Sequence, residues 1–522
     1  MSKVITPAQA ADLVKDGDRI VMSGFIGMCH PQEVTYAIEK RFLETGHPRD
    51  LDLLFPTNVG DGTDALGMNH LAHDGLLRSI VGGHWNLVPA LQKLVTENKV
   101  QAWNLPIGTL AQLLREIAGN RPGVITKIGL NTFVDPRLQG GKMNDVTKDD
   151  LVELMVIDGE EYLRYKSFKK INVGVIRGTY ADENGNMTME KEAAFLEALA
   201  MAEAVKNTGG IVIAQVEDVV ANGTLNPKDV KVPGILVDYI VKGTPANHWQ
   251  SYLDPYKPEF SGQIKRPLDA LEPMPLNARK VISRRAAMEL TPNAIVNLGI
   301  GIPEGIANVA NEEGLPGLKM TVEAGNIGGL PASGVGFGAC TNPECTIDSP
   351  AMFDFYDGGG LDQAFLGLAE CDKTGNINVS RFGPRIAGCG GFINITQSTP
   401  VVVFCGTFTA GGLKEKIGDG KLEIVNEGRI KKFKDSVEQV TFSSEFAKKA
   451  GQKVLYVTER AVFELKDGVF TLVEIAPGVD LQKDILDQME FKPAIAEDLK
   501  LMDERIFKDE PIFKDEPMGM VK

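Results

Sequence analysis

Long hydrophobic runs are missing from this sequence of 522 residues. No segment offers the roughly 18 consecutive apolar residues that a membrane-spanning helix needs. The first residues, Met-Ser-Lys-Val-Ile-Thr-Pro-Ala, also lack the charged and then apolar pattern of a secretory signal. We therefore expect a cytoplasmic protein that does not associate with a membrane.

Positive charge is in short supply as well. The chain has 55 lysines and arginines against 70 acidic residues, which gives a net charge of -15. Binding to nucleic acid needs a basic surface that displaces counterions from the phosphates. This charge balance excludes nucleic acid as an expected partner, and an anionic ligand must be held by local features.

Cysteine and histidine are scarce, with six of each. Because the cysteines show no C-x-x-C spacing, neither a metal site nor a disulfide framework is predicted, and we expect buried, reduced thiols. A catalytic Ser-His or Cys-His pair would need a histidine from the first half. The cysteines are Cys29, Cys340, Cys345, Cys371, Cys389 and Cys405, and the histidines are His30, His47, His70, His73, His84 and His248.

Proline and length together predict the domain organisation. A single core stops growing at about 250 to 300 residues, so two or more domains are expected. Six prolines between residues 244 and 276 disfavour regular helix or central strand there. We interpret 244–276 as a linker between domains at 1–243 and 277–505. The charged tail, 506–522, carries Ile-Phe-Lys-Asp-Glu-Pro twice and is interpreted as a solvated extension.

The two halves repeat one pattern of strand, glycine loop, helix and strand. It runs from Arg19 to Phe55 in the first half and from Ala294 to Glu323 in the second. The halves also share an Asp-x-x-Gly-Asn segment, at 182–186 and 372–376, which is typical of a turn. The repeat predicts an α/β fold with two related domains and mainly parallel sheets.

Glycines surround an acidic residue in the second half. The loop Gly299-Ile-Gly301-Ile-Pro-Glu-Gly305 follows an apolar strand and opens a helix, which is an anion-binding arrangement, although a tight turn alone would also explain it. Glu323 ends the next strand, where a dinucleotide-binding fold has its ribose-binding acid. Small residues crowd positions 324–338, however, and leave room for a bulky ligand beside the carboxylate. The repeat sets Phe55 opposite Glu323, so the fold itself does not require the acid.

Several segments together resemble the family I CoA-transferases, closest to the propionate and acetate CoA-transferases with fused halves. The resemblance spans nearly the whole chain. The segments are Asp16-Gly-Asp-Arg-Ile-Val-Met-Ser-Gly-Phe25, Val322-Glu-Ala-Gly325, Phe353-Asp-Phe-Tyr-Asp-Gly-Gly-Gly-Leu-Asp362, Ser380-Arg-Phe-Gly-Pro-Arg-Ile-Ala-Gly-Cys-Gly-Gly-Phe-Ile-Asn394 and Thr458-Glu-Arg-Ala-Val-Phe463.

The resemblance implies a CoA-transferase or NagB-like fold and ping-pong transfer of CoA from a short-chain acyl-CoA to a free acid. Glu323 would be the nucleophile and form a glutamyl-CoA thioester, with an oxyanion donor from Gly390 or Gly391. No metal or other cofactor is implied, since CoA is substrate and covalent intermediate. Relatives form dimers or tetramers, so a homo-oligomer is expected. The substrate-binding and CoA-binding positions would be Gly24, Ile107, Gly108, Gly299, Gly301, Asn326, Gly328 and Gly329.

One position departs from the family pattern. Ile107 stands where many relatives have glutamine. The departure favours either a second oxyanion donor from elsewhere or a more apolar acyl group. Arg381 and Arg385 are candidates for the CoA phosphates. Hydrolysis of the CoA thioester, and a non-catalytic ligand-binding role, remain alternatives at this stage.

Overall fold

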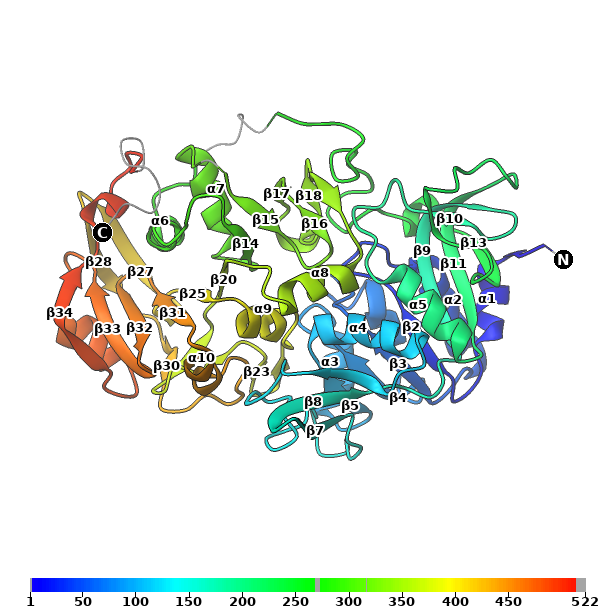
Figure 1. The fold of residues 1–522 in the computed structure, drawn as a ribbon, viewed down its shortest axis with the longest axis horizontal. Helices are drawn as coiled ribbons and strands as arrows, with labels where there is room; N and C mark the ends of the chain where they lie inside the picture. Colours follow the sequence, from blue (N-terminus) through cyan, green and yellow to red (C-terminus); the bar gives the residue numbers. More distant parts are fainter. Residues whose placement is uncertain (1, 268–272, 316, 513–522) are drawn as a thin grey trace. The chain divides into compact units, whose positions relative to one another are not determined.

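Two compact units make up the computed structural model, which describes residues 2–267, 273–315 and 317–512 (Figure 1). The first unit contains 1–266, 322–355 and 382–394, and the second contains the remainder. The sequence repeat places Glu323 in the second domain, whereas 322–355 and 382–394 group with the first half by their contacts. The domain boundaries drawn from the proline-rich segment stay a prediction, and parts of 244–276 and 506–522 lie outside the described residues.

A mainly parallel sheet forms the centre of the first unit. Its strands lie in the order β1-β13-β11-β9-β2-β3-β4-β5, and every neighbouring pair on this path is parallel. Parallel strands need crossover connections, and five helices occur between them along the chain. The strands are β1 (Val4–Ile5), β2 (Arg19–Met22), β3 (Leu51–Phe55), β4 (Leu77–Gly82), β5 (Gln101–Asn104), β9 (Val173–Asp182), β11 (Ile211–Val220) and β13 (Tyr239–Lys242); the helices are α1 (Pro7–Leu13), α2 (Gln32–Thr45), α3 (Pro89–Thr96), α4 (Ile107–Ala118) and α5 (Ala198–Asn207).

Smaller elements complete the first unit. Three antiparallel strands form a separate sheet in the order β6-β8-β7, and short antiparallel pairs follow Glu323. They are β6 (Gly123–Thr126), β7 (Val152–Ile157), β8 (Glu160–Lys166), β16 (Asn326–Ile327) with β19 (Cys345–Thr346), and β17 (Leu330–Pro331) with β18 (Cys340–Thr341). Helices α8 (Ser349–Asp357) and α9 (Phe392–Ser398) begin in this unit.

The second unit has its own sheet, in the order β15-β14-β20-β25-β31-β32-β33-β34. The pairs from β15 to β31 are parallel, and β31, β32 and β33 form an antiparallel meander. The strands are β14 (Ile295–Leu298), β15 (Lys319–Thr321), β20 (Gln363–Gly367), β25 (Val401–Cys405), β31 (Lys453–Val457), β32 (Ala461–Lys466), β33 (Val469–Ile475) and β34 (Ala494–Leu501); the helices are α6 (Ala278–Ala287), α7 (Glu304–Glu312) and α10 (Ser444–Ala450). The prediction of an α/β protein with two domains of mainly parallel sheets is confirmed.

The internal repeat is visible in strand order and in turn chemistry. β2 lies between β3 and β9, and β14 lies between β15 and β20 in the same way. In the first Asp-x-x-Gly-Asn turn, the Asp182 carboxylate accepts bonds from the Asn184 and Asn186 N–H groups. Asp372 accepts the equivalent bonds in the second turn, from Thr374 and Asn376. The two turns are therefore built alike, as predicted.

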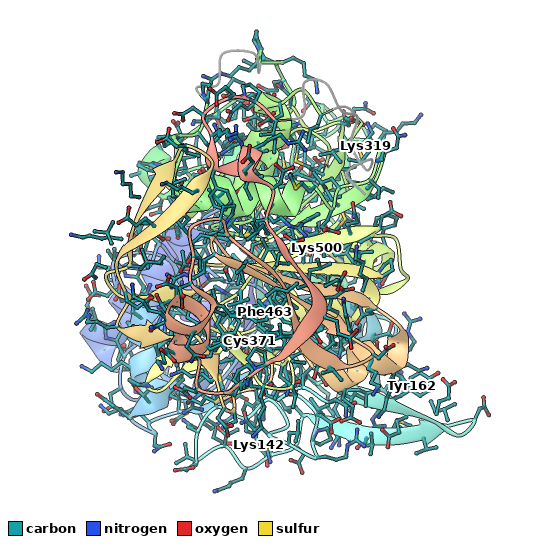
Figure 2. All side chains as sticks on the ribbon, turned by 90° about the vertical axis from the view of Figure 1, so that its left-hand side faces the viewer. Lys142, Tyr162, Lys319, Cys371, Phe463 and Lys500 are labelled. Atoms are coloured by element: carbon teal, nitrogen blue, oxygen red, sulfur yellow. The ribbon has the colours of Figure 1, made fainter. Side chains whose placement is uncertain are left out.

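Aromatic rings fill the core between the meander and the strands beside it in the second unit. Phe463, labelled in Figure 2, lies with its ring centroid 4.7 Å from that of Phe470 and 5.1 Å from that of Phe433. Such pairs are worth about 0.5 to 1.5 kcal/mol beyond the area they bury. They fix this end of the unit.

Two expectations from the sequence are wrong in part. The first copy of the C-terminal repeat is solvated only in part, since Ile506 and Phe507 are fully buried and Arg284 donates to the Glu510 carbonyl oxygen at 3.0 Å, while residues 509–511 are exposed. The apolar residues of this charged repeat pack into the core of the second unit. Cys345 is exposed, whereas the other cysteines are buried. In the part of the chain that the structure describes, no helix is long and apolar enough to cross a bilayer.

Candidate active site

Glu323 lies in a tight turn that begins two residues after β15 ends. The Val322 N–H donates to the Asn326 carbonyl oxygen at 2.9 Å, and the Gly325 N–H donates back to the Val322 carbonyl oxygen at 2.9 Å. The Ser349 hydroxyl donates to the Glu323 carbonyl oxygen at 3.3 Å. These bonds fix the backbone that carries the carboxylate.

The Glu323 carboxyl group is enclosed by protein atoms, although the residue keeps some exposed surface. Its Oε2 is buried and has no hydrogen-bond partner among the residues that the structure describes. Burial raises the pKa of Glu323 to about 7, because water no longer stabilises the charged form. An unpaired buried carboxyl is costly to keep, so this group is a strong candidate for a functional residue.

Gly391 makes the closest approach to this carboxyl group. A β-carbon at 391 would lie 3.0 Å from Glu323 Oε1 and 3.3 Å from the Phe353 ring. Such distances are below ordinary van der Waals contact, so only glycine leaves the carboxylate in place. Glu323 and Gly391, which come from separate motifs of the sequence, are therefore in direct contact in the structure.

The two glycines of the predicted oxyanion pair differ in their bonding. The Gly390 N–H donates to the Gly83 carbonyl oxygen at 2.9 Å, and the Gly390 carbonyl oxygen accepts from the Ile107 N–H at 3.0 Å. The Gly391 N–H has no acceptor within the described part of the chain. The amide of Gly390 is thus committed to the fold, and Gly391 is the member of the pair whose amide can bind a ligand.

Asn104, which the sequence analysis missed, joins the loops around this glycine pair. Its amide nitrogen donates to the Gly82 and Gly83 carbonyl oxygens at 3.0 and 2.7 Å. Its side-chain oxygen accepts from the Cys389 N–H at 2.9 Å. Asn104 ends β5, and the site therefore lies at the carboxyl ends of parallel strands, where α/β folds place their ligands.

Ile107 and Gly108 open helix α4 next to the same loop. The Gly108 N–H donates to the Asn394 side-chain oxygen at 3.2 Å. A β-carbon at 108 would collide with the Phe353 ring, so glycine is required for this packing. Ile107 is buried and presents apolar surface to Gly390. These contacts explain both residues as supports of the site, and their predicted role in substrate binding stays a prediction.

Gly24 lies in the loop between β2 and α2, in the first unit. The Thr57 hydroxyl donates to its carbonyl oxygen, and the Ser23 hydroxyl donates to the Cys29 carbonyl oxygen at 2.7 Å. Ile26 in this loop has a φ of +59°, which a β-branched residue rarely adopts. Backbone strain of this kind is concentrated at functional sites.

The segment after Glu323 contains three predicted binding residues, Asn326, Gly328 and Gly329, whose observed contacts are with other parts of the protein. The Asn326 amide nitrogen donates to the Ala193 and Gly338 carbonyl oxygens at 3.0 and 2.8 Å. A β-carbon at Gly328 would lie 2.6 Å from the Glu344 side chain. The three residues hold the hairpin after the candidate nucleophile, and direct contact between them and CoA remains a prediction.

Gly299 and Gly301 belong to the second unit. The Gly299 N–H donates to the Phe365 carbonyl oxygen at 2.8 Å, and the Arg279 guanidinium donates to the Gly301 carbonyl oxygen at 2.8 Å. Of the two arginine candidates for phosphate binding, Arg381 pairs with Glu438 at 3.3 Å and Arg385 donates to the Asn86 side chain at 2.7 Å. No observation assigns phosphate binding to these four residues, and their role stays a prediction.

His84 is a second residue that the sequence analysis did not single out. It follows β4 in the segment Gly82-Gly83-His84-Trp85 and approaches Gly390. The sequence position of His84 could have indicated a functional role, since two glycines and a histidine at the end of a buried strand are typical of a binding loop.

Comparisons with known proteins place the whole chain among the CoA-transferases. A family model described as Coenzyme A transferase matches residues 4–243. The caffeate CoA-transferase of Acetobacterium woodii is 51% identical and the alignment covers 99% of this chain and 100% of that protein. The acetate CoA-transferase YdiF of Escherichia coli K12 is 44% identical, over 97% of this chain and 95% of that one.

Two crystal structures of YdiF from Escherichia coli O157:H7 share the fold. The apoenzyme has a TM-score of 0.92 at 44% identity, covering 98% of this chain and 97% of that chain. The thioester complex with CoA has a TM-score of 0.92 at 43% identity, with the same coverage.

Proposed function

Because the chain belongs to the CoA-transferase family, we propose that it moves CoA from an acyl-CoA to a free carboxylic acid through a thioester on Glu323. The observation that carries this proposal is the Glu323 carboxyl group, which is buried and unpaired at Oε2 and lies against Gly391. A carboxylate held in this way has no structural partner to give up before it reacts.

The reaction begins with attack by the Glu323 carboxylate on the thioester carbonyl carbon. The carbon–sulfur bond breaks, CoA leaves as a thiolate, and a mixed anhydride between Glu323 and the acyl group remains. The thiolate then attacks the glutamyl carbonyl carbon of that anhydride. This step forms glutamyl-CoA and releases the donor acid as a carboxylate.

The acceptor acid runs the same steps in reverse. Its carboxylate attacks glutamyl-CoA and releases the CoA thiolate, which then attacks the acyl side of the new anhydride. The new acyl-CoA forms and the Glu323 carboxylate is regenerated. One thioester bond is broken and one is made in each half-reaction, so no other energy source is needed.

The surroundings of Glu323 suit this chemistry. Burial raises the pKa of Glu323 to about 7, so the carboxylate is more basic than an exposed one and yet is substantially ionised at neutral pH. Each addition places negative charge on a former carbonyl oxygen, and in this proposal the Gly391 N–H, which has no acceptor within the described residues, donates to it. One such donor is typically worth about 10² to 10³ in rate.

Short-chain acids are the substrates that we propose, namely acetate, propionate, lactate or butyrate. The buried, apolar Ile107 beside Gly390 supports an apolar acyl group. The name of the relative from Acetobacterium woodii, caffeate CoA-transferase, supports a second candidate class, the aryl-substituted acrylates. Steady-state kinetics over a panel of both acid classes decides between them. We also propose a homodimer or homotetramer, which light scattering of the purified protein tests.

The covalent intermediate is the direct test of the mechanism. Incubation with propionyl-CoA or acetyl-CoA is expected to add one CoA to the intact protein mass. Excess acetate should remove it, and Glu323→Ala should never show it. Glu197→Gln is a matched control, since Glu197 is also a buried carboxyl without partners among the described residues. This variant should form the adduct at the wild-type level.

Two results would contradict the proposal. An active wild-type protein whose mass never changes would exclude the glutamyl thioester, and an adduct on Glu323→Ala would place it on another residue. Loss of the adduct without any acid, at a rate that matches turnover, would instead favour thioester hydrolysis.

A further inference from the structure

His84 is held in place by its two neighbours in the chain. The Gly83 carbonyl oxygen accepts from the Gly390 N–H at 2.9 Å, and the Trp85 N–H donates to the Ala387 carbonyl oxygen at 2.8 Å. Both bonds connect the loop after β4 to the loop that carries the glycine pair. The position of His84 is therefore fixed relative to Gly390 and Gly391.

The His84 ring lies beside the glycine pair. A β-carbon at Gly390 would be 3.3 Å from His84 Cδ2 and 3.9 Å from Ile107 Cδ1. A β-carbon at the next residue, Gly391, would be 3.0 Å from Glu323 Oε1. His84 and the candidate nucleophile thus approach adjacent residues of one loop.

The ring nitrogens of His84 have no hydrogen-bond partner in the described part of the chain. The other five histidines all have one. Their partners are Ser23 and Thr35 for His30, Asp16 for His47, Glu39 for both His70 and His73, and Gln215 for His248. His84 is half-buried, and its ring nitrogens are therefore available to hydrogen-bond to a ligand.

The protonation state of His84 narrows the kind of ligand. Burial, with a smaller effect from the charge on Arg385, lowers the pKa of His84 to about 4. At neutral pH the ring is therefore uncharged and carries one N–H donor and one acceptor nitrogen. A neutral imidazole can polarise a carbonyl group by donating a hydrogen bond to it.

We propose that His84 is a further catalytic residue, whose ring N–H donates to the acyl oxygen that becomes negatively charged when Glu323 attacks. The inference rests on the proposed function. Gly391 and His84 would supply two donors to that oxygen, one from the backbone and one from a side chain. Ile107 contributes only apolar surface on this side of Gly390, whereas the His84 ring beside the same glycine can hydrogen-bond to the substrate.

No proton is transferred in this role. As the Glu323 oxygen bonds to the carbonyl carbon, the π electron pair moves onto the carbonyl oxygen, and the hydrogen bond from His84 strengthens. When the thiolate leaves, the pair returns and the bond weakens again. The gain is therefore confined to the addition steps, and binding of the intact acyl-CoA changes little.

The test compares two substitutions of His84 in a single-turnover experiment. The rate of CoA adduct formation on Glu323 is followed by rapid quench and intact mass, with propionyl-CoA as the probe. His84→Leu removes the donor and should slow the step about 10²-fold with little change in KM, while His84→Gln keeps a donor and should recover most of the rate. His73→Gln is the control. His73 follows the 3₁₀ helix Gly67–Leu71 and pairs with Glu39, so this variant should react like the wild type.

Each other outcome overturns the inference. Wild-type rates in His84→Leu would show that the ring does not act, while the glutamyl thioester would still stand. Equal losses in His84→Leu and His84→Gln, with lowered melting temperatures, would show a structural role. A wild-type protein that forms no adduct would overturn the proposed function and this inference with it.

Discussion

Replacing Gly391 with alanine tests whether the position of the Glu323 carboxylate matters for catalysis. The substitution leaves the Gly391 N–H in place and adds one methyl group, which would lie 3.0 Å from Glu323 Oε1 and 3.1 Å from its Cγ. Ordinary contacts begin near 3.4 Å. The carboxyl group must therefore move by a few tenths of an ångström, and the Phe353 ring, 3.3 Å from the same methyl group, limits how far the methyl group itself can shift.

The expected cost follows from that displacement. A misplacement of about 1 Å in a reacting group can lower the rate about 10²-fold, so a shift of a few tenths of an ångström should lower it about 10-fold. A 10-fold loss corresponds to about 1.4 kcal/mol of activation free energy. Overpacking of a buried site also costs about 1 to 3 kcal/mol of stability. We therefore expect kcat to fall about 10-fold while KM for the acyl-CoA changes little.

The assay is steady-state transfer from propionyl-CoA to acetate, together with a thermal melt. Gly367→Ala is the matched control, because a β-carbon at this strand residue would have no atom within 4 Å. It should keep wild-type kcat. A Gly391→Ala protein that is folded and has wild-type kcat would refute the reasoning, since the carboxylate would then tolerate the shift.

Two further predictions concern pH and the repeated turn. The pKa of the Glu323 carboxyl is about 4.5 in the unfolded chain and about 7 in the folded protein. Between these pH values the folded protein holds a proton that the unfolded chain releases. The group therefore lowers the stability of the fold as pH rises through this window. Glu323→Gln should therefore raise the melting temperature at pH 8, with a gain that shrinks toward pH 4; an equal gain at both would contradict the raised pKa. Asp182 and Asp372 are buried and accept equivalent hydrogen bonds in the two turns, so Asp182→Ala and Asp372→Ala should each lower thermal stability by a similar amount, about 2 kcal/mol. Strongly unequal losses would contradict the likeness of the two turns.

Much of the fold could be predicted because its signals are local. The apolar runs at 19–22 and 295–298, each followed by glycines and a helical pattern, do form β2 and β14 with α2 and α7 behind them. The turns at Asp182 and Asp372 could also be predicted from their residue types. The burial of Ile506 and Phe507 was not, because charged neighbours dominate that repeat and only the packed structure shows where its apolar residues go.

The residues of the candidate site also differ in how far the sequence could predict them. Glu323 could be named from its glycine-rich surroundings and from family motifs, because both are contiguous in the chain. Gly390 and Gly391 are indistinguishable in sequence, and only the bond from the Gly390 N–H to Gly83 separates them. His84 was one of six histidines until its unpaired ring was found beside Gly390.

The sequence by itself determined the fold class, the internal repeat, the transferase family and the candidate nucleophile, because periodicity, turn residues and motifs are properties of neighbouring positions. The tertiary structure alone decided which amide is available, why Gly391 has to be glycine and which histidine lacks a partner. These are properties of atoms brought together from distant segments, such as 83–85 and 387–391, and a hydrogen bond or a collision exists only once those segments meet.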